Sequence, residues 1–317
     1  MKWLGGPTLT TILYIEGEWN PVLLPDEMDG AFFYDGYKDM QQMETSFASG
    51  EIQKANCLLI AAVDETLAWG MERNIAAAAY ANPLFPGQTF SGCTMVIEGF
   101  EEVDADFLVR IFERFHHIPW TIAVTKRCVI REFCMEDLDA LISLYDQPGV
   151  TYQLDAKGQR QPGYIEPLFA REEEAEYQQA YITHMYGYYG YGMWLVFDRT
   201  TGNLIGRAGL EHRDFDGQTE LEMGYVIAPA WQGQGIATEV CGAIIKFARE
   251  ELDFPRLNAL TDAKNAASIV LLEKLGFAYT EDSDAAGSRM RRYVYNFEHK
   301  KPYRYCLLYT SDAADDL

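Results

Sequence analysis

The sequence predicts an α/β protein made of two units. Residues 1–123 are expected to form a small unit with a largely parallel sheet, and residues 124–298 a larger unit with a mixed, mostly antiparallel sheet flanked by helices. Three observations support this prediction. The length of 317 residues suits about two domains. Strand-like and helix-like segments alternate in the first part, whereas hairpin turns join successive apolar strands in the second.

In the first unit, the short apolar run 57–64 predicts a buried strand. The alanine-rich segment 65–80 predicts a helix that ends before an Asn-Pro pair. A second strand is expected at 93–99. Segment 101–119 predicts a helix, because apolar residues recur there at helical spacing: Phe107, Leu108, Ile111 and Phe115.

The second unit has more elements, and its central turns favour antiparallel pairing. The turns "RTTGN" and "DFDGQ" are typical of hairpins, and Gly276 suits the position just after a helix end. The expected order is a strand at 127–133, a helix at 135–145, a polar loop at 147–167, a helix at 170–186, strands at 193–198, 204–211 and 219–228, a helix at 235–252, a strand at 256–262, a helix at 265–275, and strands at 277–281 and 289–297.

The composition limits the classes of function. The formal net charge is −22, and no cluster of Lys and Arg is large enough to neutralise a nucleic-acid backbone. No apolar run reaches the ~18 residues of a membrane span, and the N-terminal segment lacks a small-residue cleavage site of a signal peptide. The six cysteines lie far apart, and the adjacent His116 and His117 have poor spacing for a metal. We therefore expect a cytoplasmic protein with buried thiols, no metal, no nucleic-acid partner and no membrane contact.

The last residues do not continue the pattern that precedes them. Residues 299–317 are interpreted as a tail, and its end, "CLLYTSDAADDL" at 306–317, resembles a translated sequencing-adapter read-through. A natural acidic tail is the alternative. Either way, the segment does not contribute to the fold prediction.

The stretch "APAWQGQGIATEV" at 228–240 joins an expected strand to an expected helix. Backbone N–H groups at a helix N-terminus attract anions, and glycine allows a ligand to approach the backbone closely. One face of the helix is apolar, so the helix can pack on a sheet while its N-terminus stays free: Ile236, Val240, Ile244 and Phe247. The stretch therefore indicates an anion site, with a tight turn that binds nothing as the alternative.

Two common nucleotide motifs are excluded at this stretch. The dinucleotide fingerprint GxGxxG fails, because Thr238 stands where the third glycine belongs. A P-loop fails because no Gly-Lys-Ser/Thr follows.

The run Gln232–Ala237, "QGQGIA", matches the Q/R-x-x-G-x-G/A motif of GNAT-fold, acetyl-CoA-dependent N-acetyltransferases. Further segments resemble that family in the same order: "KRCVIREFCMEDLDAL", "LIGRAGLE", "LEMGYVI" and "NAASIVLLEKLGF". The first of them resembles the branch that includes ribosomal-protein-alanine N-acetyltransferases. The resemblance covers residues 126–296, does not extend to residues 1–123, and implies the mixed α+β sheet of the GNAT fold.

The resemblance implies roles for particular residues in binding acetyl-CoA as co-substrate. Backbone of Val226, Ile227 and Ala228 would pair with the pantetheine arm like an added strand. Asn265 and Ser268 would face the cofactor, although an ordinary helix cap also explains Asn265. The CoA diphosphate would be held by backbone amides of Gln232, Gly233, Gln234, Gly235, Ile236 and Ala237.

Acetyl transfer to an amine needs a base, an oxyanion donor and a way for the thiolate to leave. Strict alternation in "ELEMGYVI" places Glu222 on one face of its strand with Glu220, Gly224 and Val226. The resemblance implies that Glu222 is the base, and a solvated or hydrogen-bonded glutamate is the alternative. It also implies that a main-chain N–H of this strand, that of Val226, meets the oxyanion.

The leaving group marks a departure from the family pattern. Many members carry a general-acid tyrosine at the position that is Leu272 here. The proton is then expected from Ser268 or water, or the thiolate leaves unassisted.

The acceptor is expected to be a primary amine, either a small molecule or a peptide N-terminus. Four tyrosines and three glycines in "HMYGYYGYGMW", 184–194, are consistent with a wall of the acceptor site or, equally, with a hairpin of core aromatics. The acidic segment 171–181 is interpreted as a solvated helix face. The sequence carries no signal for the oligomeric state.

The first unit loosely resembles half of a haloacid-dehalogenase-like, Rossmann-like domain. Segment 27–32, "EMDGAF", is similar to the DxDGT motif of that family, but Glu27 replaces the nucleophilic aspartate. We therefore expect a non-catalytic partner domain. Two alternatives to an N-acetyltransferase stay open: a non-catalytic acyl-CoA sensor, and a phosphohydrolase in the first unit that depends on Asp29.

Overall fold

The computed structural model describes residues 6–297, except 26, 27, 29, 94, 102, 216, 253, 286 and 287. The chain divides into two compact units, with the boundary between Trp120 and Thr121. Glu27 and Asp29 lie outside the described residues, as does the tail 299–317.

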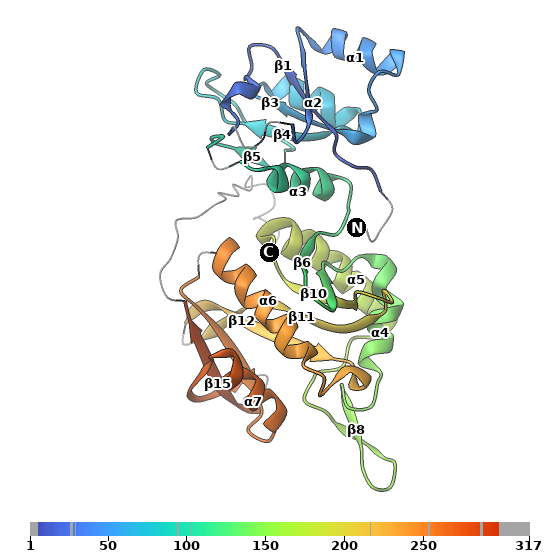
Figure 1. Ribbon diagram of the computed structural model, residues 1–317, viewed down its shortest axis with the longest axis vertical. Coiled ribbons are helices and arrows are strands. Elements are labelled where there is room, and N and C mark those ends of the chain that lie inside the picture. The colour runs from blue at the N-terminus through green and yellow to red at the C-terminus, as the bar shows by residue number, and fades with distance from the viewer. Residues whose placement is uncertain are drawn as a thin grey trace. The chain divides into compact units, whose positions relative to one another are not determined.

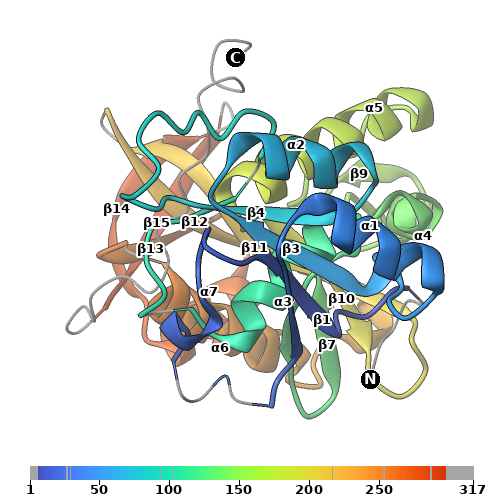
Figure 2. The ribbon, with the colours of Figure 1, turned by 90° about the horizontal axis from the view of Figure 1, so that it is seen from above.

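The first unit is built on a five-stranded sheet in which every pair of neighbouring strands is parallel, as predicted. Helices α1 (Met40–Ser49) and α2 (Asp64–Glu72) cover one face, and α3 (Ala105–Phe115) covers the other (Figure 1). The strand order is β2 (Phe33–Tyr37), β1 (Thr11–Ile15), β3 (Cys57–Ala61), β4 (Ala76–Tyr80) and β5 (Val96–Ile97). Figure 2 shows β1, β3 and β4 from above.

The prediction of a helix over 65–80 is wrong in its second half. Helix α2 ends at Glu72, and Ala76–Tyr80 form β4, a central strand between β3 and β5. Ala76 and Ala78 face one core cluster, while Ala77 and Ala79 face the other. Burial on both faces therefore overrides the helix propensity of alanine.

The order of the strands reverses between β1 and β3, where open α/β sheets bind their ligands. Here a side chain of the unit itself occupies that place. The buried carboxylate of Glu18 accepts hydrogen bonds from the N–H of Ala62 at 2.8 Å, the N–H of Val63 at 3.2 Å and the hydroxyl of Thr66 at 2.6 Å. Glu18 therefore accepts from backbone N–H groups just before α2 and from a hydroxyl of its first turn, whereas the N-cap Val63 makes no side-chain hydrogen bond.

The second unit contains an eight-stranded sheet, mixed and mostly antiparallel as predicted. Every neighbouring pair is antiparallel except β12 with β13. The order is β14 (Ala278–Ala285), β15 (Ser288–Asn296), β13 (Arg256–Thr261), β12 (Gln218–Ile227), β11 (Leu204–Phe215), β10 (Met193–Asp198), β7 (Cys128–Arg131) and β6 (Thr121–Val124).

Four α-helices accompany this sheet: α4 (Leu138–Tyr145), α5 (Arg171–Tyr181), α6 (Ile236–Glu251) and α7 (Ala266–Leu275). The predicted apolar face of α6 is confirmed, because Ile236, Val240, Ile244 and Phe247 are all buried in the core of the unit. Helix α7 ends at Gly276, whose φ of 95° confirms the predicted end signal.

Two segments differ from their predictions. The loop expected at 147–167 contains a small hairpin of β8 (Tyr152–Leu154) and β9 (Arg160–Pro162). The helix expected at 170–186 continues instead as a π-helix, η5 (Ile182–Tyr189), so 184–194 is no hairpin. Other short helices among the described residues are η1 (Pro21–Leu23), η3 (Lys54–Asn56), η4 (Met135–Asp137) and η6 (Pro229–Trp231).

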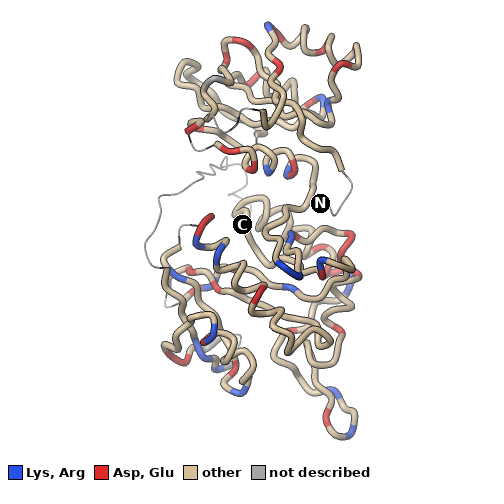
Figure 3. Tube along the Cα trace, viewed as in Figure 1, with Lys and Arg blue, Asp and Glu red and all other residues tan. Residues whose placement is uncertain are grey.

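The surface charge and the thiols agree with the composition. Lys and Arg are interspersed with the more numerous Asp and Glu along the traced chain (Figure 3). The five described cysteines are all buried. Within the described ranges, no helix combines the length and the apolar character that a membrane crossing requires.

Candidate active site

The loop between β12 and α6 has a backbone that only glycine adopts readily. Gly233 has a φ of 70° and Gly235 a φ of 77°, both in the left-handed region. Gly235 is the N-cap of α6, with no side-chain hydrogen bond to satisfy the first turn. The two glycines therefore turn the chain sharply and leave the start of α6 bare.

The backbone N–H groups of this loop are available to a ligand. Residues Gln232–Gly235 are exposed, and no described residue accepts a hydrogen bond from the N–H groups of Gly233 through Ala237. These groups lie at the positive end of the dipole of a 16-residue helix. The arrangement fits an anion with several oxygens, as the sequence predicted.

Arg127 fixes the loop, and sequence reasoning missed it. Its Nη1 donates to the carbonyl of Gln234 at 2.8 Å, and its Nε lies 2.7 Å from a carboxylate oxygen of Glu239 in the first turn of α6. The backbone N–H of Arg127 also donates to Glu239. The guanidinium therefore offsets the negative charge of Glu239 beside the helix start. The two residues are 112 positions apart in the sequence, so no local pattern indicates their contact.

A gap opens beside the loop because β12 and β13 separate. Their parallel register contains two pairs, Leu221 with Leu257 and Glu222 with Asn258, although both strands, described in full, continue beyond them. On its other edge, β12 pairs with β11 along its whole length. The edge of β12 from Met223 to Ile227 is therefore open toward the gap.

The ladder between β11 and β12 determines which backbone groups face this gap. The N–H of Ala228 donates to the carbonyl of Ile205 on β11. In an antiparallel ladder, the backbone groups of every second residue point toward the same neighbouring strand. Val226 therefore belongs to the set that faces β11. Tyr225 and Ile227 belong to the set that faces the gap. The N–H expected to meet an oxyanion is thus better placed at Tyr225 than at Val226.

Gln232 and Ile227, both predicted site residues, lie in contact. The Nε2 of Gln232 donates to the carbonyl of Ile227 at 2.8 Å. This bond joins the loop to the end of the open strand edge, so that the anion site and the gap form one continuous path along the backbone. Val226, Ile227 and Ala228 are themselves buried.

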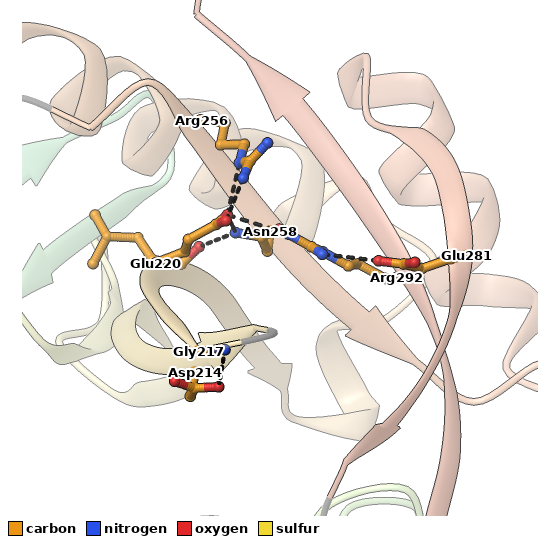
Figure 4. A network of polar contacts seen from close by, with 8 residues as sticks. Asp214, Gly217, Glu220, Arg256, Asn258, Glu281 and Arg292 are labelled. Atoms are coloured by element: carbon orange, nitrogen blue, oxygen red, sulfur yellow. Dashed lines mark hydrogen bonds and ion pairs between the residues drawn. The ribbon is translucent and has the colours of Figure 1, made fainter.

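A buried polar network holds β12 and β13 together just before they separate (Figure 4). Asn258 donates to the carbonyl of Leu221 at 3.1 Å and to Glu220 at 2.8 Å. Arg292 donates from Nε to Asn258 at 2.9 Å and from Nη1 to Glu281 at 2.8 Å. Glu220 also binds Arg256, and that hydrogen bond is the main reason why the pKa of Glu220 lies below its usual value.

Glu222, the predicted base, lies on the face of β12 opposite to the face of Tyr225. Burial raises the pKa of Glu222, while the nearby Arg213 guanidinium, with which it forms an ion pair, acts in the opposite direction. Its cross-strand neighbour Glu211 raises the pKa further. A carboxylate beside an open strand edge, with a pKa raised above the ordinary glutamate value, is suited to act as a proton acceptor.

The start of α7 supplies the other predicted polar residues. Asn265 caps the helix, because its Oδ1 accepts from the N–H of Ser268 at 3.2 Å, as the alternative interpretation expected. The Ser268 hydroxyl lies 2.7 Å from the hydroxyl of Tyr225 on β12. Leu272 is fully buried and contributes no polar group.

The tyrosine-rich segment 184–194 forms no hairpin, but it contributes aromatic side chains to the core, and its part as a wall of the acceptor site stays a prediction. Tyr186 and Tyr191 are buried, whereas Tyr188 is 41% and Tyr189 36% exposed. On the Glu222 face of the sheet, the hydroxyl of Tyr181 accepts from the N–H of Met193 at 2.8 Å and lies 3.5 Å from Glu211. Aromatic side chains thus border the carboxylates. No group of three or more His, Cys, Asp or Glu in the described part of the chain is placed to hold a metal ion.

Known proteins are similar in sequence to this region of the chain. The family model described as the acetyltransferase (GNAT) domain matches residues 127–278. The Bacillus subtilis protein YkkB, which is uncharacterised, is 32% identical over 165 residues, covering 51% of this chain and 87% of that protein. The B. subtilis N-acetyltransferase YoaA is 27% identical over 156 residues, covering 49% of this chain and 82% of that protein.

Solved structures also match. An acetyl transferase from Salmonella typhimurium that modifies the N-terminal serine of ribosomal protein L7/L12 aligns with a TM-score of 0.45 and 18% identity, covering 56% of this chain and 100% of that one. Because the family model matches residues 127–278 and a relative above 30% identity is covered over most of its length, the chain belongs to the GNAT family of acetyltransferases.

Proposed function

We propose that the second unit transfers an acetyl group from acetyl-CoA to a primary amine by direct attack in a ternary complex. The observation that carries this proposal is the continuity of two features. A row of free backbone N–H groups begins at Gly233, and the open edge of β12 leads away from it through Ile227 to Tyr225. In acetyl-CoA, a diphosphate that can accept from such N–H groups is followed by an extended pantetheine arm that can lie along such a strand edge.

The first step of the proposal is binding of acetyl-CoA. The diphosphate would accept hydrogen bonds from the loop, including the predicted residues Gln232–Ala237, with Arg127 holding the loop in place. Because these contacts come from the backbone, a protein with a net charge of −22 can bind a polyanion without a basic surface. The pantetheine arm would then lie in the gap along the edge of β12 from Tyr225 to Ile227, with Asn265 beside it, whereas the predicted pairing with the backbone of Val226 and Ala228 is ruled out because both face β11.

The second step is attack on the thioester. The N–H of Tyr225 would stabilise the oxyanion, since the N–H of Val226 faces β11. Glu222 would accept a proton from the amine, directly or through one water, as nitrogen bonds to the carbonyl carbon. The C–S bond then breaks, its electron pair moves to sulfur, and CoA leaves.

The acceptor is proposed to be an amine of a small molecule or a peptide N-terminus that enters on the Glu222 face. Glu211, Glu222 and the ring of Tyr181 border this side of β12. Carboxylates and aromatic rings both attract a cationic amine before it loses its proton.

The test is release of CoA thiol from acetyl-CoA with a panel of amines and peptides, comparing wild type with Glu222→Gln. The variant should lose roughly 10²-fold or more in kcat and keep the acetyl-CoA affinity, because a general base contributes about that much. Glu250→Gln, on the exposed surface of α6, is the matched control and should behave as wild type.

Two outcomes would contradict the proposal. An unchanged rate in Glu222→Gln would remove Glu222 as the base. Tight acetyl-CoA binding by the wild type without turnover on any acceptor would instead support a non-catalytic acyl-CoA sensor.

A further inference from the structure

The hydroxyl groups of Tyr225 and Ser268 form a bridge across the gap. Tyr225 lies on β12 beyond its last pair with β13, and Ser268 lies on α7, which follows β13. Their oxygens are 2.7 Å apart. Three residues beyond Glu222, where the two strands separate, a side chain of β12 is thus joined to the helix that follows β13.

This bridge lies where the reaction needs a donor. When the C–S bond of the thioester breaks, sulfur receives the electron pair and becomes an anion. Leu272, at the position of the usual general acid, is apolar, and the thiol of Cys241, on α6, is fully buried with a raised pKa. The backbone N–H of Tyr225 faces the gap, so a carbonyl bound there would bring the neighbouring sulfur close to the same residue.

We propose that the Tyr225 hydroxyl donates a hydrogen bond to the departing sulfur of CoA, and that Ser268 is a positioning residue that donates to the Tyr225 oxygen. This inference rests on the proposed function. In the resulting chain, Ser268 O–H points to Tyr225, and Tyr225 O–H points to sulfur. Asn265 holds Ser268 in place through the helix cap. Each donor strengthens the next, as in other buried chains of hydrogen bonds.

Tyr225 donates without losing its proton. Burial raises the pKa of Tyr225 to about 12, far above the ordinary value of a thiol, about 8.5. Complete transfer from the phenol to the thiolate is therefore unfavourable. CoA leaves as a thiolate held by a neutral hydroxyl and takes its proton from solvent, while the proton of the amine passes to Glu222 and then to solvent.

The direct test is the pKa of the thiol of bound CoA, followed by thiolate absorbance in the complex of CoA with the full-length protein. A donor at sulfur stabilises the thiolate, so Tyr225→Phe should raise the acid dissociation pKa of bound CoA by about one unit, a tenfold change. The same variant should lower kcat by roughly 10-fold with little change in KM, because this hydrogen bond strengthens only as sulfur gains negative charge.

Two further variants separate this role from a structural one. Tyr279→Phe is the control. It removes an exposed hydroxyl of the same sheet, which donates to the Asp282 carboxylate, and it should leave the pKa of the CoA thiol unchanged. Ser268→Ala should raise the thiol pKa by less than Tyr225→Phe does, and it keeps the test open if Tyr225→Phe folds poorly.

The inference is overturned if Tyr225→Phe and Ser268→Ala bind CoA with an unchanged thiol pKa while the wild type turns over. In that case the proposed function stands and only the donor is wrong. If the wild type itself binds no CoA, the proposed function has failed, and the two failures are thereby distinguished.

Discussion

The pKa of Glu222 is raised by some neighbours and lowered by another, and mutation can separate these effects. Burial and Glu211 raise its pKa, and Arg213 lowers it. A base works when deprotonated, so activity should fall as the pH drops through this raised pKa, which places the acidic limb above the ordinary range for a glutamate.

Replacing Arg213 by methionine should move that limb to still higher pH. The substitution removes the ion pair that favours the charged carboxylate and leaves the two raising influences in place. The measurement is kcat/KM against pH, with Arg249→Met on the surface of α6 as the control. A limb that stays in place, or moves to lower pH, would show that Glu222 does not set it.

Most candidate residues of the site could be predicted, and the exceptions have a physical cause. The loop Gln232–Ala237 carries a local signal, glycines at a strand-to-helix junction. The role predicted for Glu222 came from the resemblance, and alternation along the strand gave only its face. Arg127 was missed because its contact is far away in sequence. The same alternation leaves Tyr225 on the opposite face of β12, and nothing local reveals that its hydroxyl meets Ser268.

At the scale of elements, alanine in place of Gly235, the N-cap of α6, and of Gly242, inside α6, should change the stability of the protein in opposite directions. Gly235 has a φ of 77°, so Gly235→Ala should cost about 1–2 kcal/mol in the free energy of unfolding and weaken acetyl-CoA binding about tenfold by moving the loop amides. Gly242 lies within the helix, and a Cβ there meets nothing within 4 Å. Gly242→Ala should therefore stabilise the protein by about 0.5–1 kcal/mol.

Chemical denaturation and calorimetric titration of both variants check this pair. If Gly235→Ala bound acetyl-CoA as tightly as the wild type, the loop conformation would have no part in binding. A destabilised Gly242→Ala would show that the reasoning about α6 is at fault.

The elements show what periodicity can predict and where burial overrides it. The apolar face of α6 and the end of α7 at Gly276 were predicted correctly because solvent lies on one side of these helices. The alanines of β4 were predicted as helix because the sequence does not reveal that both faces of that strand are covered. The strands β1, β2 and β6 were not predicted, since short segments carry little periodic signal.

At the scale of the whole molecule, the two units differ in what their sheets leave open. In the first unit, the Glu18 carboxylate accepts from the N–H groups of Ala62 and Val63 just before α2. In the second unit, one parallel pair within an otherwise antiparallel sheet opens beside the start of α6, where no described residue accepts a hydrogen bond from the N–H groups of Gly233 through Ala237. For this reason we propose that acetyl-CoA binds to the second unit.

Hydrogen exchange of the backbone amides, with and without acetyl-CoA, tests that assignment most directly, because the N–H groups of Gly233–Ala237 are themselves the proposed ligands. Saturating acetyl-CoA should slow exchange at these amides and at Tyr225, and leave residues 6–120 unchanged. Protection confined to the first unit, or exchange at Gly233–Ala237 that acetyl-CoA does not alter, would contradict the account.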